Sequence, residues 1–121
     1  TDMLEVTVRS GNVSRSLVGT VFGQSVIRIV ELDGFRVELE PAGEVAIFFN
    51  DDKPGVIGQY GQVLGEAGIN IAHMTVARKP GDGAAVAMNL DAAPEPALLK
   101  AILGIDAVQG VHALHLPELP A

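Results

Sequence analysis

The chain has 121 residues, of which 48% are hydrophobic, and it carries a formal net charge of −7 and no cysteine. This length and apolar content suffice for one compact domain or two small ones. The acidic balance argues against nucleic acid or an anionic membrane surface as a partner, because both reward a basic patch. The absence of cysteine excludes a disulfide framework and a thiolate zinc site, and it fits a cytoplasmic protein. Because the sequence starts at Thr1 rather than at an initiator methionine, we expect a fragment of a longer protein.

Residues 3–40 are predicted to form an antiparallel β meander. Apolar and polar residues alternate over 4–9 and again over 35–40, which is typical of half-buried strands. Turns are expected at 10–12 and 23–25. Asp33-Gly34 is the strongest hairpin signal, because a type I′ turn needs positive φ at both central positions. Pro41-Ala-Gly43 then marks a boundary, so we divide the chain into residues 1–42 and 43–121.

The second part is predicted to follow the order βαββαβ. Residues 45–49 form a short apolar run, and a helix with an apolar stripe follows, which Gly68 ends as its left-handed residue. The next strand begins at Asn70. The remaining elements are expected as a turn at 79–83, a strand at 84–90, a helix at 96–103 and a strand at 108–116. The fold class is therefore α+β, an antiparallel meander followed by a ferredoxin-like domain with its helices on one face of the sheet.

Polar residues lie at both ends of the first helix of this part. A free amino acid presents an ammonium group, which a carboxylate such as Asp52 would accept. It also presents a carboxylate, which the amides of Asn50 and Asn70 and a helix N-terminus would bind. The residue types leave another interpretation open. Asp51 and Asp52 are also able to cap the helix, and Asn70 is an ordinary residue after a helix.

Three glycines, Gly58, Gly61 and Gly65, lie inside the predicted helix at spacings of three and four. Each costs about 1 kcal/mol of helix propensity relative to alanine. Such a stripe favours the close approach of another backbone. Two interpretations remain open, namely tight packing of the helix on its own sheet, and an intersubunit contact or ligand site.

No catalytic or metal-binding set is expected in this chain. The sequence holds neither a dinucleotide-binding fingerprint nor a nucleophile with its base. His112 and His115 stand three apart on a strand, so their side chains should point to opposite faces. His73 is expected on the same strand face as Ile69 and Ile71, at a sheet face or interface.

Two motifs carry a resemblance to a known family. Residues 52–58, Asp-Lys-Pro-Gly-Val-Ile-Gly, and 64–74, Leu-Gly-Glu-Ala-Gly-Ile-Asn-Ile-Ala-His-Met, resemble the first strand–loop–helix–strand of the ACT domain, a module that binds amino acids. With the upstream blocks at 19–23, 28–30 and 33–37, nearly the whole chain resembles the C-terminal regulatory part of the D-3-phosphoglycerate dehydrogenases. The similar form carries an extra allosteric domain before the ACT domain. Residues 1–42 would belong to that anion- or substrate-binding domain and 43–121 to the ACT domain.

The resemblance implies an effector site between two ACT modules of a homo-oligomer. In that family, serine is contacted at the positions of Asn50, Asp52 and Asn70, although relatives often carry a histidine or an aromatic residue where this chain has Asn50. The parent would be an NAD-dependent oxidoreductase of L-serine biosynthesis. Its cofactor and catalytic residues would lie upstream of Thr1, with no cofactor in this segment.

The resemblance also implies an anion site that includes Arg28, although Glu40 stands where a second basic residue is expected. An acid there would repel an anion. The alternative is that Arg28 and Arg36 lie on a solvated strand surface.

Other functions fit the same module. An ACT-type regulatory segment also occurs in other amino-acid enzymes, such as the iron–sulfur L-serine dehydratases, or as a free-standing amino-acid sensor. The βαββαβ fold also serves RNA-binding modules. The acidic charge and the aromatic content of only 4% argue against stacked bases here.

Overall fold

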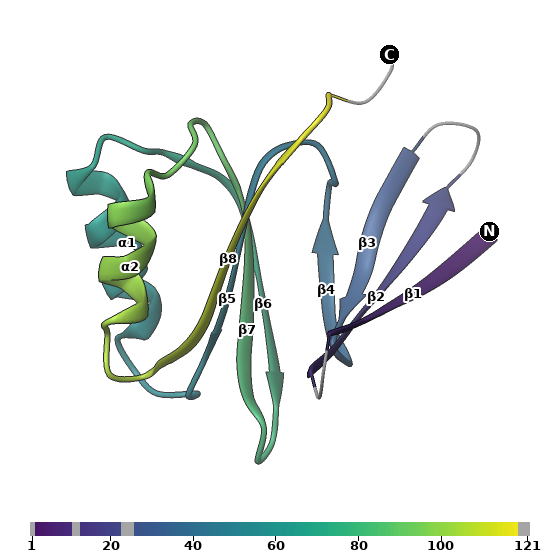
Figure 1. Ribbon diagram of the computed structural model, residues 1–121, viewed down its shortest axis with the longest axis horizontal. Helices are drawn as coiled ribbons and strands as arrows, with labels where there is room; N and C mark the ends of the chain where they lie inside the picture. Colours follow the sequence, from purple (N-terminus) through teal and green to yellow (C-terminus); the bar gives the residue numbers. More distant parts are fainter. Residues whose placement is uncertain (1, 11–12, 23–25, 119–121) are drawn as a thin grey trace.

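The computed structural model describes residues 2–10, 13–22 and 26–118 in three layers, with two helices, a four-stranded sheet and a second four-stranded sheet (Figure 1). The strands of the first sheet are β1 (Asp2–Ser10), β2 (Val13–Phe22), β3 (Val26–Leu32) and β4 (Phe35–Leu39). The remaining elements are β5 (Gly43–Asn50), α1 (Val56–Glu66), β6 (Ile71–Lys79), β7 (Gly83–Leu90), α2 (Pro96–Leu103) and β8 (Val108–Leu116). Neither helix has the length and apolar character that a membrane crossing requires.

The first sheet is the predicted meander, with strand order β1-β2-β3-β4 and antiparallel neighbours. Its last hairpin turns at Asp33 and Gly34, whose φ angles are +48° and +82°, so the predicted turn with two positive φ values is confirmed. The Asp33 carboxylate also accepts a hydrogen bond from the backbone N–H of Ser16 at 2.7 Å. This bond ties the turn to β2. The predicted turn residues 11–12 and 23–25 lie outside the described part of the chain.

The second sheet has strand order β6-β7-β5-β8, and all its pairs are antiparallel. This is the split arrangement that the βαββαβ order predicts, so the expected α+β fold is confirmed. Both helices cover one face of this sheet, while the meander lies against the other (Figure 1).

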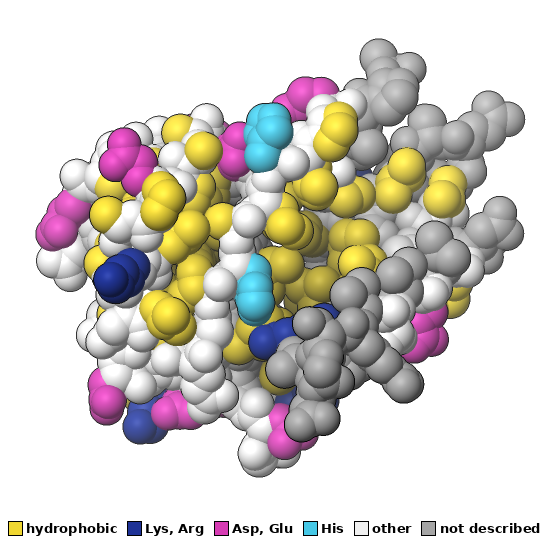
Figure 2. Space-filling model, in the orientation of Figure 1, with side chains coloured by type: hydrophobic (Ala, Val, Ile, Leu, Met, Phe, Trp, Pro, Cys, Tyr) yellow, Lys and Arg dark blue, Asp and Glu magenta, His cyan; other side chains and the backbone are white. Residues whose placement is uncertain are grey.

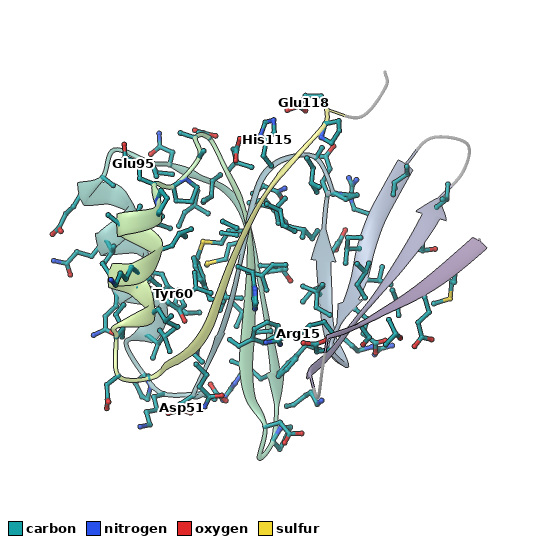
Figure 3. The ribbon with its side chains drawn as sticks, in the orientation of Figure 1. Arg15, Asp51, Tyr60, Glu95, His115 and Glu118 are labelled. Carbon is teal, nitrogen blue, oxygen red and sulfur yellow. The ribbon has the colours of Figure 1, made fainter. Side chains whose placement is uncertain are left out.

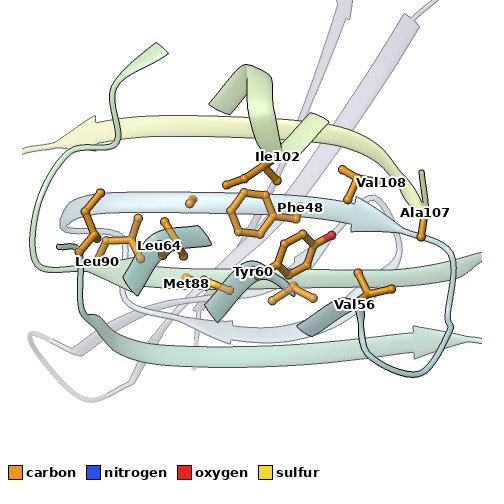
Figure 4. Packing of buried hydrophobic residues seen from close by; sticks show 12 residues of the cluster. Phe48, Val56, Tyr60, Leu64, Met88, Leu90, Ile102, Ala107 and Val108 are labelled. Atoms are coloured by element: carbon orange, nitrogen blue, oxygen red, sulfur yellow. The ribbon is translucent and has the colours of Figure 1, made fainter. Parts of the chain in front are cut away.

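The helix-side core forms between the helices and the second sheet (Figure 4). The apolar stripe of α1 places Val56, Tyr60 and Leu64 in it, as the helical spacing predicts. Gly68 follows α1 with φ +78°, and the N–H of Ile69 reaches back to the carbonyl of Leu64 at 3.0 Å. This bond satisfies a carbonyl that the helix end would leave without a partner, which explains the glycine.

The meander-side cluster joins the two sheets. The chain turns from one sheet into the other over the few residues between Leu39 and Gly43. Two side chains of the second sheet also contact backbone carbonyls at the end of the meander. The amide of Asn89 donates to the carbonyl of Glu40 at 2.9 Å, and Nε2 of His73 lies 3.2 Å from the carbonyl of Glu38. The apolar members of the cluster are Leu32, Phe35, Val37, Leu39, Val45, Ile47, Ala77, Ala85 and Ala87. The division at residue 42 stays a prediction, since the two parts share this cluster.

One prediction about β6 is wrong. Ile71 and His73 do not share a face, because the register shifts between them, so that Ile71 pairs with Leu90 but His73 pairs with Asn89. The extra residue is a β-bulge, which resets the alternation of side chains. Ile71 therefore packs on the helix-side core, and His73 faces the meander.

Candidate functional site

The loop between β5 and α1 does not cap the helix with its acidic side chains. The N-cap residue is Gly55, with φ +87° and no side-chain hydrogen bond, so the capping interpretation of Asp51 and Asp52 is wrong. Asp51 instead accepts a hydrogen bond from Gln109 and lies 3.7 Å from the ammonium of Lys53. The Asp52 carboxylate lies 2.8 Å from Nε of Arg78 on β6. Neither carboxylate is therefore required at the start of the helix.

Asn50 points inward. It is 4% exposed, its amide donates to the carbonyl of Asp51 at 2.7 Å, and its Oδ1 accepts from the Tyr60 hydroxyl at 2.9 Å. Burial raises the pKa of Tyr60 to about 12, so this hydroxyl remains a donor at neutral pH. In this chain Asn50 holds the loop on α1, and a ligand contact by its side chain stays a prediction. One feature of the sequence points to the hydrogen bond between Tyr60 and Asn50. Tyr60 lies in the apolar stripe of the helix, and a buried hydroxyl needs a hydrogen-bond partner.

Asp52 is available to solvent. Its side chain is 41% exposed, and among the described residues its one side-chain partner is the still more accessible Arg78, which is 71% exposed. Surface pairs of this kind contribute only about 0–1 kcal/mol. A ligand ammonium could therefore replace Arg78 at little cost. Arg78 was not among the residues singled out from the sequence, because its pairing depends on the strand register.

Asn70 lies at the other end of α1 from Asp52. It is exposed and directly precedes β6, where Ile71 pairs with Leu90, whereas the loop end of β5 pairs with Ala84. The 11 residues of α1 span about 16 Å between the two ends. Figure 3 shows this separation, with Asp51 at one end of the sheet and Glu95, near the Asn70 end, at the other. One chain therefore does not bring Asp52 and Asn70 together.

The glycines of α1 face open space. A Cβ at Gly58, Gly61 or Gly65 would meet no atom within 4 Å, so tight packing of these glycines on their own sheet is wrong. The neighbouring edge strand β6 exposes Met74 by 39% and Val76 by 40%. Their β7 partners Met88 and Val86 are fully buried in the helix-side core, so the exposed side chains lie on the helix face of the sheet. We call these five residues the α1–β6 surface.

Arg28 lies in a cleft of about 300 Å³ between the two sheets, which is also lined by Glu38, Glu40, Ala72, His73 and Asn89. One N–H of Arg28 is used by the carbonyl of Ile27 at 2.9 Å. The lining thus includes one basic and two acidic residues. An anion site at Arg28 stays a prediction, and the negative charge of Glu40 opposes it.

The three histidines lie apart. His115 pairs with Glu44, His73 faces Glu38, and His112 stacks edge-on against Phe49 with ring centroids 5.9 Å apart. Burial, followed by the charge of Arg15, lowers the pKa of His112 from its ordinary value. Within the described residues, no three histidine or acidic side chains are grouped closely enough to hold a metal ion.

These observations define the class first, an α+β module of ferredoxin-like topology with an exposed polar loop and an open helix face. Comparison with known proteins then gives the family. The model of the ACT domain matches residues 45–106, which is just over half of the chain. The chain belongs to the ACT domain family.

Curated relatives extend the match into the meander. The chain is 38% identical over 109 residues to D-3-phosphoglycerate dehydrogenase of Archaeoglobus fulgidus, covering 88% of this chain and 20% of the relative. It is 34% identical over 114 residues to the protein of the same name from Methanocaldococcus jannaschii, covering 93% and 22%. It is also 33% identical over 75 residues to a probable L-serine dehydratase beta chain of Bacillus subtilis, covering 62% and 34%. The chain thus spans about a fifth of the length of the dehydrogenases that it matches.

Proposed function

We propose that this chain is the allosteric regulatory segment of an NAD-dependent D-3-phosphoglycerate dehydrogenase, and that it binds L-serine or a related amino acid between two copies of its ACT domain. The ACT match and the relatives of that name support the regulatory role. The residues of this chain would bind the amino acid and couple its binding to the activity of the parent protein. Catalysis and NAD binding would belong to other domains of the parent.

The separation of Asp52 from Asn70 carries the proposal. A two-fold axis that pairs the α1–β6 surfaces of two copies runs their β6 strands in opposite directions. The Asp52 end of one copy then lies beside the Asn70 end of the other. Asp52 would take the ammonium of the amino acid, and the amide of the partner copy's Asn70 would take its carboxylate.

The α1–β6 surface suits such a contact. β6 is an edge strand, and an open edge that carries exposed methionine and valine is a liability unless something covers it. The exposed glycines allow a second helix backbone to approach closely. A ligand that touches both copies binds the dimer better than the monomer, so it must strengthen association by linkage.

The test is the dimer dissociation constant, measured by sedimentation with and without saturating L-serine. Serine should tighten the wild-type dimer, and Asn70→Ala should abolish that tightening while leaving the ligand-free dimer nearly intact. Lys100→Ala is the control, because Lys100 is exposed on α2, the helix that packs on β8 at the opposite edge of the sheet. A wild-type dimer that is indifferent to serine would refute the intersubunit site.

Gly61→Ala tests the contact itself. In the monomer the new methyl group meets no atom, so the helix should gain about 0.5–1 kcal/mol of stability. If a second helix lies on this surface, the same methyl group should weaken the dimer. A variant that is more stable and associates as tightly as wild type would show that the glycines face solvent in the dimer as well.

The match to the dehydratase beta chain favours a second candidate, a regulatory segment of an L-serine dehydratase. Assay of the parent protein separates the two. NAD reduction with D-3-phosphoglycerate identifies the dehydrogenase, and deamination of L-serine identifies the dehydratase.

A further inference from the structure

A second cleft between the two sheets lies outside the proposed serine site. It has a volume of about 320 Å³, and apolar side chains from both sheets form its walls, namely Leu17, Leu32, Ile47, Phe49 and Leu114. Figure 2 shows the hollow, with hydrophobic side chains on its floor and a histidine and a basic side chain beside it. Such a volume, apolar walls and a position between two structural units are typical of small-molecule sites.

Four polar residues, Arg15, Ser16, Asp33 and His112, complete the lining. The guanidinium of Arg15 lies 4.9 Å from the centroid of the Phe49 ring and 2.7 Å from the Asp33 carboxylate. Figure 3 shows Arg15 in the space between the two sheets. The imidazole of His112 packs edge-on against the same wall residue, Phe49, with ring centroids 5.9 Å apart. Two nitrogen-bearing groups therefore meet at one apolar wall.

The hydrogen-bonding groups that these residues leave available to a ligand favour an acid. Both oxygens of Asp33 are occupied, one by Arg15 and one by the backbone N–H of Ser16, and its side chain is only 21% exposed. Arg15 is 48% exposed and spends one of its five N–H donors on Asp33. Burial and then the charge of Arg15 lower the pKa of His112, and an anion beside Arg15 would offset the second of these effects.

We propose that this cleft binds a monocarboxylic acid with an aliphatic or aromatic body, whose carboxylate lies on the half-exposed Arg15 at the mouth of the cleft and whose body lies between Leu17, Ile47 and Leu114. The volume of the cleft is that of roughly ten water-sized groups, and it limits the size of the ligand's apolar body. Because the walls come from both sheets, the bound acid holds the meander against the ACT sheet and favours the packed arrangement by linkage.

The test uses three probes with one body, 4-phenylbutyrate, 4-phenylbutanol and 4-phenylbutylamine. Each is titrated into the purified chain, with affinity from calorimetry and location from amide chemical shifts. The acid should bind about tenfold tighter than the alcohol and tighter still than the amine, because it alone gains a charge-assisted bond to Arg15. The shifts should concentrate at residues 15–17, 32–33, 47–49 and 112–114.

Two variants, each with a matched control, distinguish the contact of the ligand's apolar body from the contact of its carboxylate. Leu114→Asp places a charge in the wall and should abolish binding of all three probes, whereas Leu103→Asp, on an equally exposed leucine of α2, should not. Arg15→Gln should reduce the acid to the affinity of the alcohol. Arg36→Gln, an exposed arginine outside the cleft, should leave the preference for the acid intact.

The proposal is wrong if none of the probes binds at millimolar concentration, if the amine or the alcohol equals the acid, or if binding survives Leu114→Asp. Native chemical shifts away from the substitution show that each variant has folded. The experiment involves neither serine nor the dimer, so its failure leaves the proposed effector site standing, and failure of that site leaves this cleft standing.

Discussion

The two faces of the ACT sheet are packed in different ways. On the helix side, large side chains interdigitate (Figure 4), and Phe48, Tyr60, Leu64, Met88 and Ile102 are each at most 1% exposed. On the meander side, β4 packs over the small residues Ala77, Ala85 and Ala87 of β6 and β7, and the larger Val45 and Ile47 of β5 lie in the same cluster. The helix side is one continuous core. The meander side is a contact along β4 with an open cleft on each margin.

This difference separates stability from ligand access. Interdigitated side chains leave no room for a ligand and make any truncation costly. The alanines of β6 and β7 let β4 approach the sheet closely, whereas Ile47, Phe49 and Leu114 form walls of the open cleft beside it. We therefore expect the helix side to set the folding stability and the meander side to respond to small molecules and charge.

The largest effect is expected for truncation on the helix side. Phe48→Ala removes a ring that is fully buried and stacks on Tyr60 with centroids 4.5 Å apart, so it should cost about 3–5 kcal/mol of unfolding free energy. Phe35→Ala on the meander side should cost about 3 kcal/mol or less, because the loosely packed meander is able to collapse toward the vacancy. Urea unfolding measures both.

Hydrogen exchange of the same two variants sharpens the comparison. In Phe35→Ala, amides of β4 should lose protection while those of β5 and β7 keep it, since the helix-side core is intact. If Phe35→Ala destabilises as much as Phe48→Ala, or if both variants lose protection uniformly, the two faces form one cooperative unit and the comparison fails.

The next effect concerns the polar bond inside the helix-side core. Tyr60→Phe leaves the buried Oδ1 of Asn50 without its donor and should cost about 1–3 kcal/mol at neutral pH. Burial raises the folded-state pKa of Tyr60 to about 12 from the ordinary tyrosine value of 10.0, so folding favours its neutral form. The stability that the neutral hydroxyl contributes is fully present below pH 10 and is lost as pH rises from 10 toward 12.

Alkaline unfolding of the pair of proteins checks the sign. Wild type should lose stability across that range, and Tyr60→Phe should lose less, so the two curves converge. Parallel curves would mean that the hydroxyl of Tyr60 has the same pKa in the folded and unfolded states.

Local sequence patterns predicted most of the architecture. The α1 stripe, Gly68 at the helix end and the Asp33-Gly34 turn are each determined by neighbouring residues, and each is confirmed. The α+β class is confirmed because it follows from the order of these elements.

Features that depend on tertiary register were missed. The bulge before His73 leaves no mark in the alternation of β6, and the partners of Asp51 and Asp52 are distant in sequence, at Gln109 and Arg78. The packing of the meander on the sheet, which creates both clefts, is likewise a contact between segments that no local pattern encodes. The candidate site was therefore predicted as a set of residue types, without the geometry that separates Asn70 from Asp52.

A smaller effect is expected in the Arg28 cleft on the meander side. Glu40→Gln removes the charge of one of the two acidic residues that line the cleft and should strengthen phosphate binding by about 1 kcal/mol, or about fivefold. Glu95→Gln, an exposed residue at the start of α2, is the control and should change nothing. Phosphate titration by calorimetry at low salt measures the effect. An unchanged affinity in Glu40→Gln would remove the case for an anion at Arg28.

The smallest effect is the pH dependence of the meander-side contact through His112. Its folded-state pKa is lowered, first by burial and then by Arg15, with Asp33 acting in the opposite direction, so the unfolded chain binds its proton more readily. The stability that the neutral imidazole contributes is thus fully present above the ordinary histidine pKa of 6.5 and is lost as pH falls below it. His112→Gln should lose less stability than wild type between pH 7.5 and 5, with the slopes differing by less than about one proton. Urea midpoints across this range give the slopes, and identical slopes in wild type and His112→Gln would show that the meander contact does not depend on the charge of this histidine.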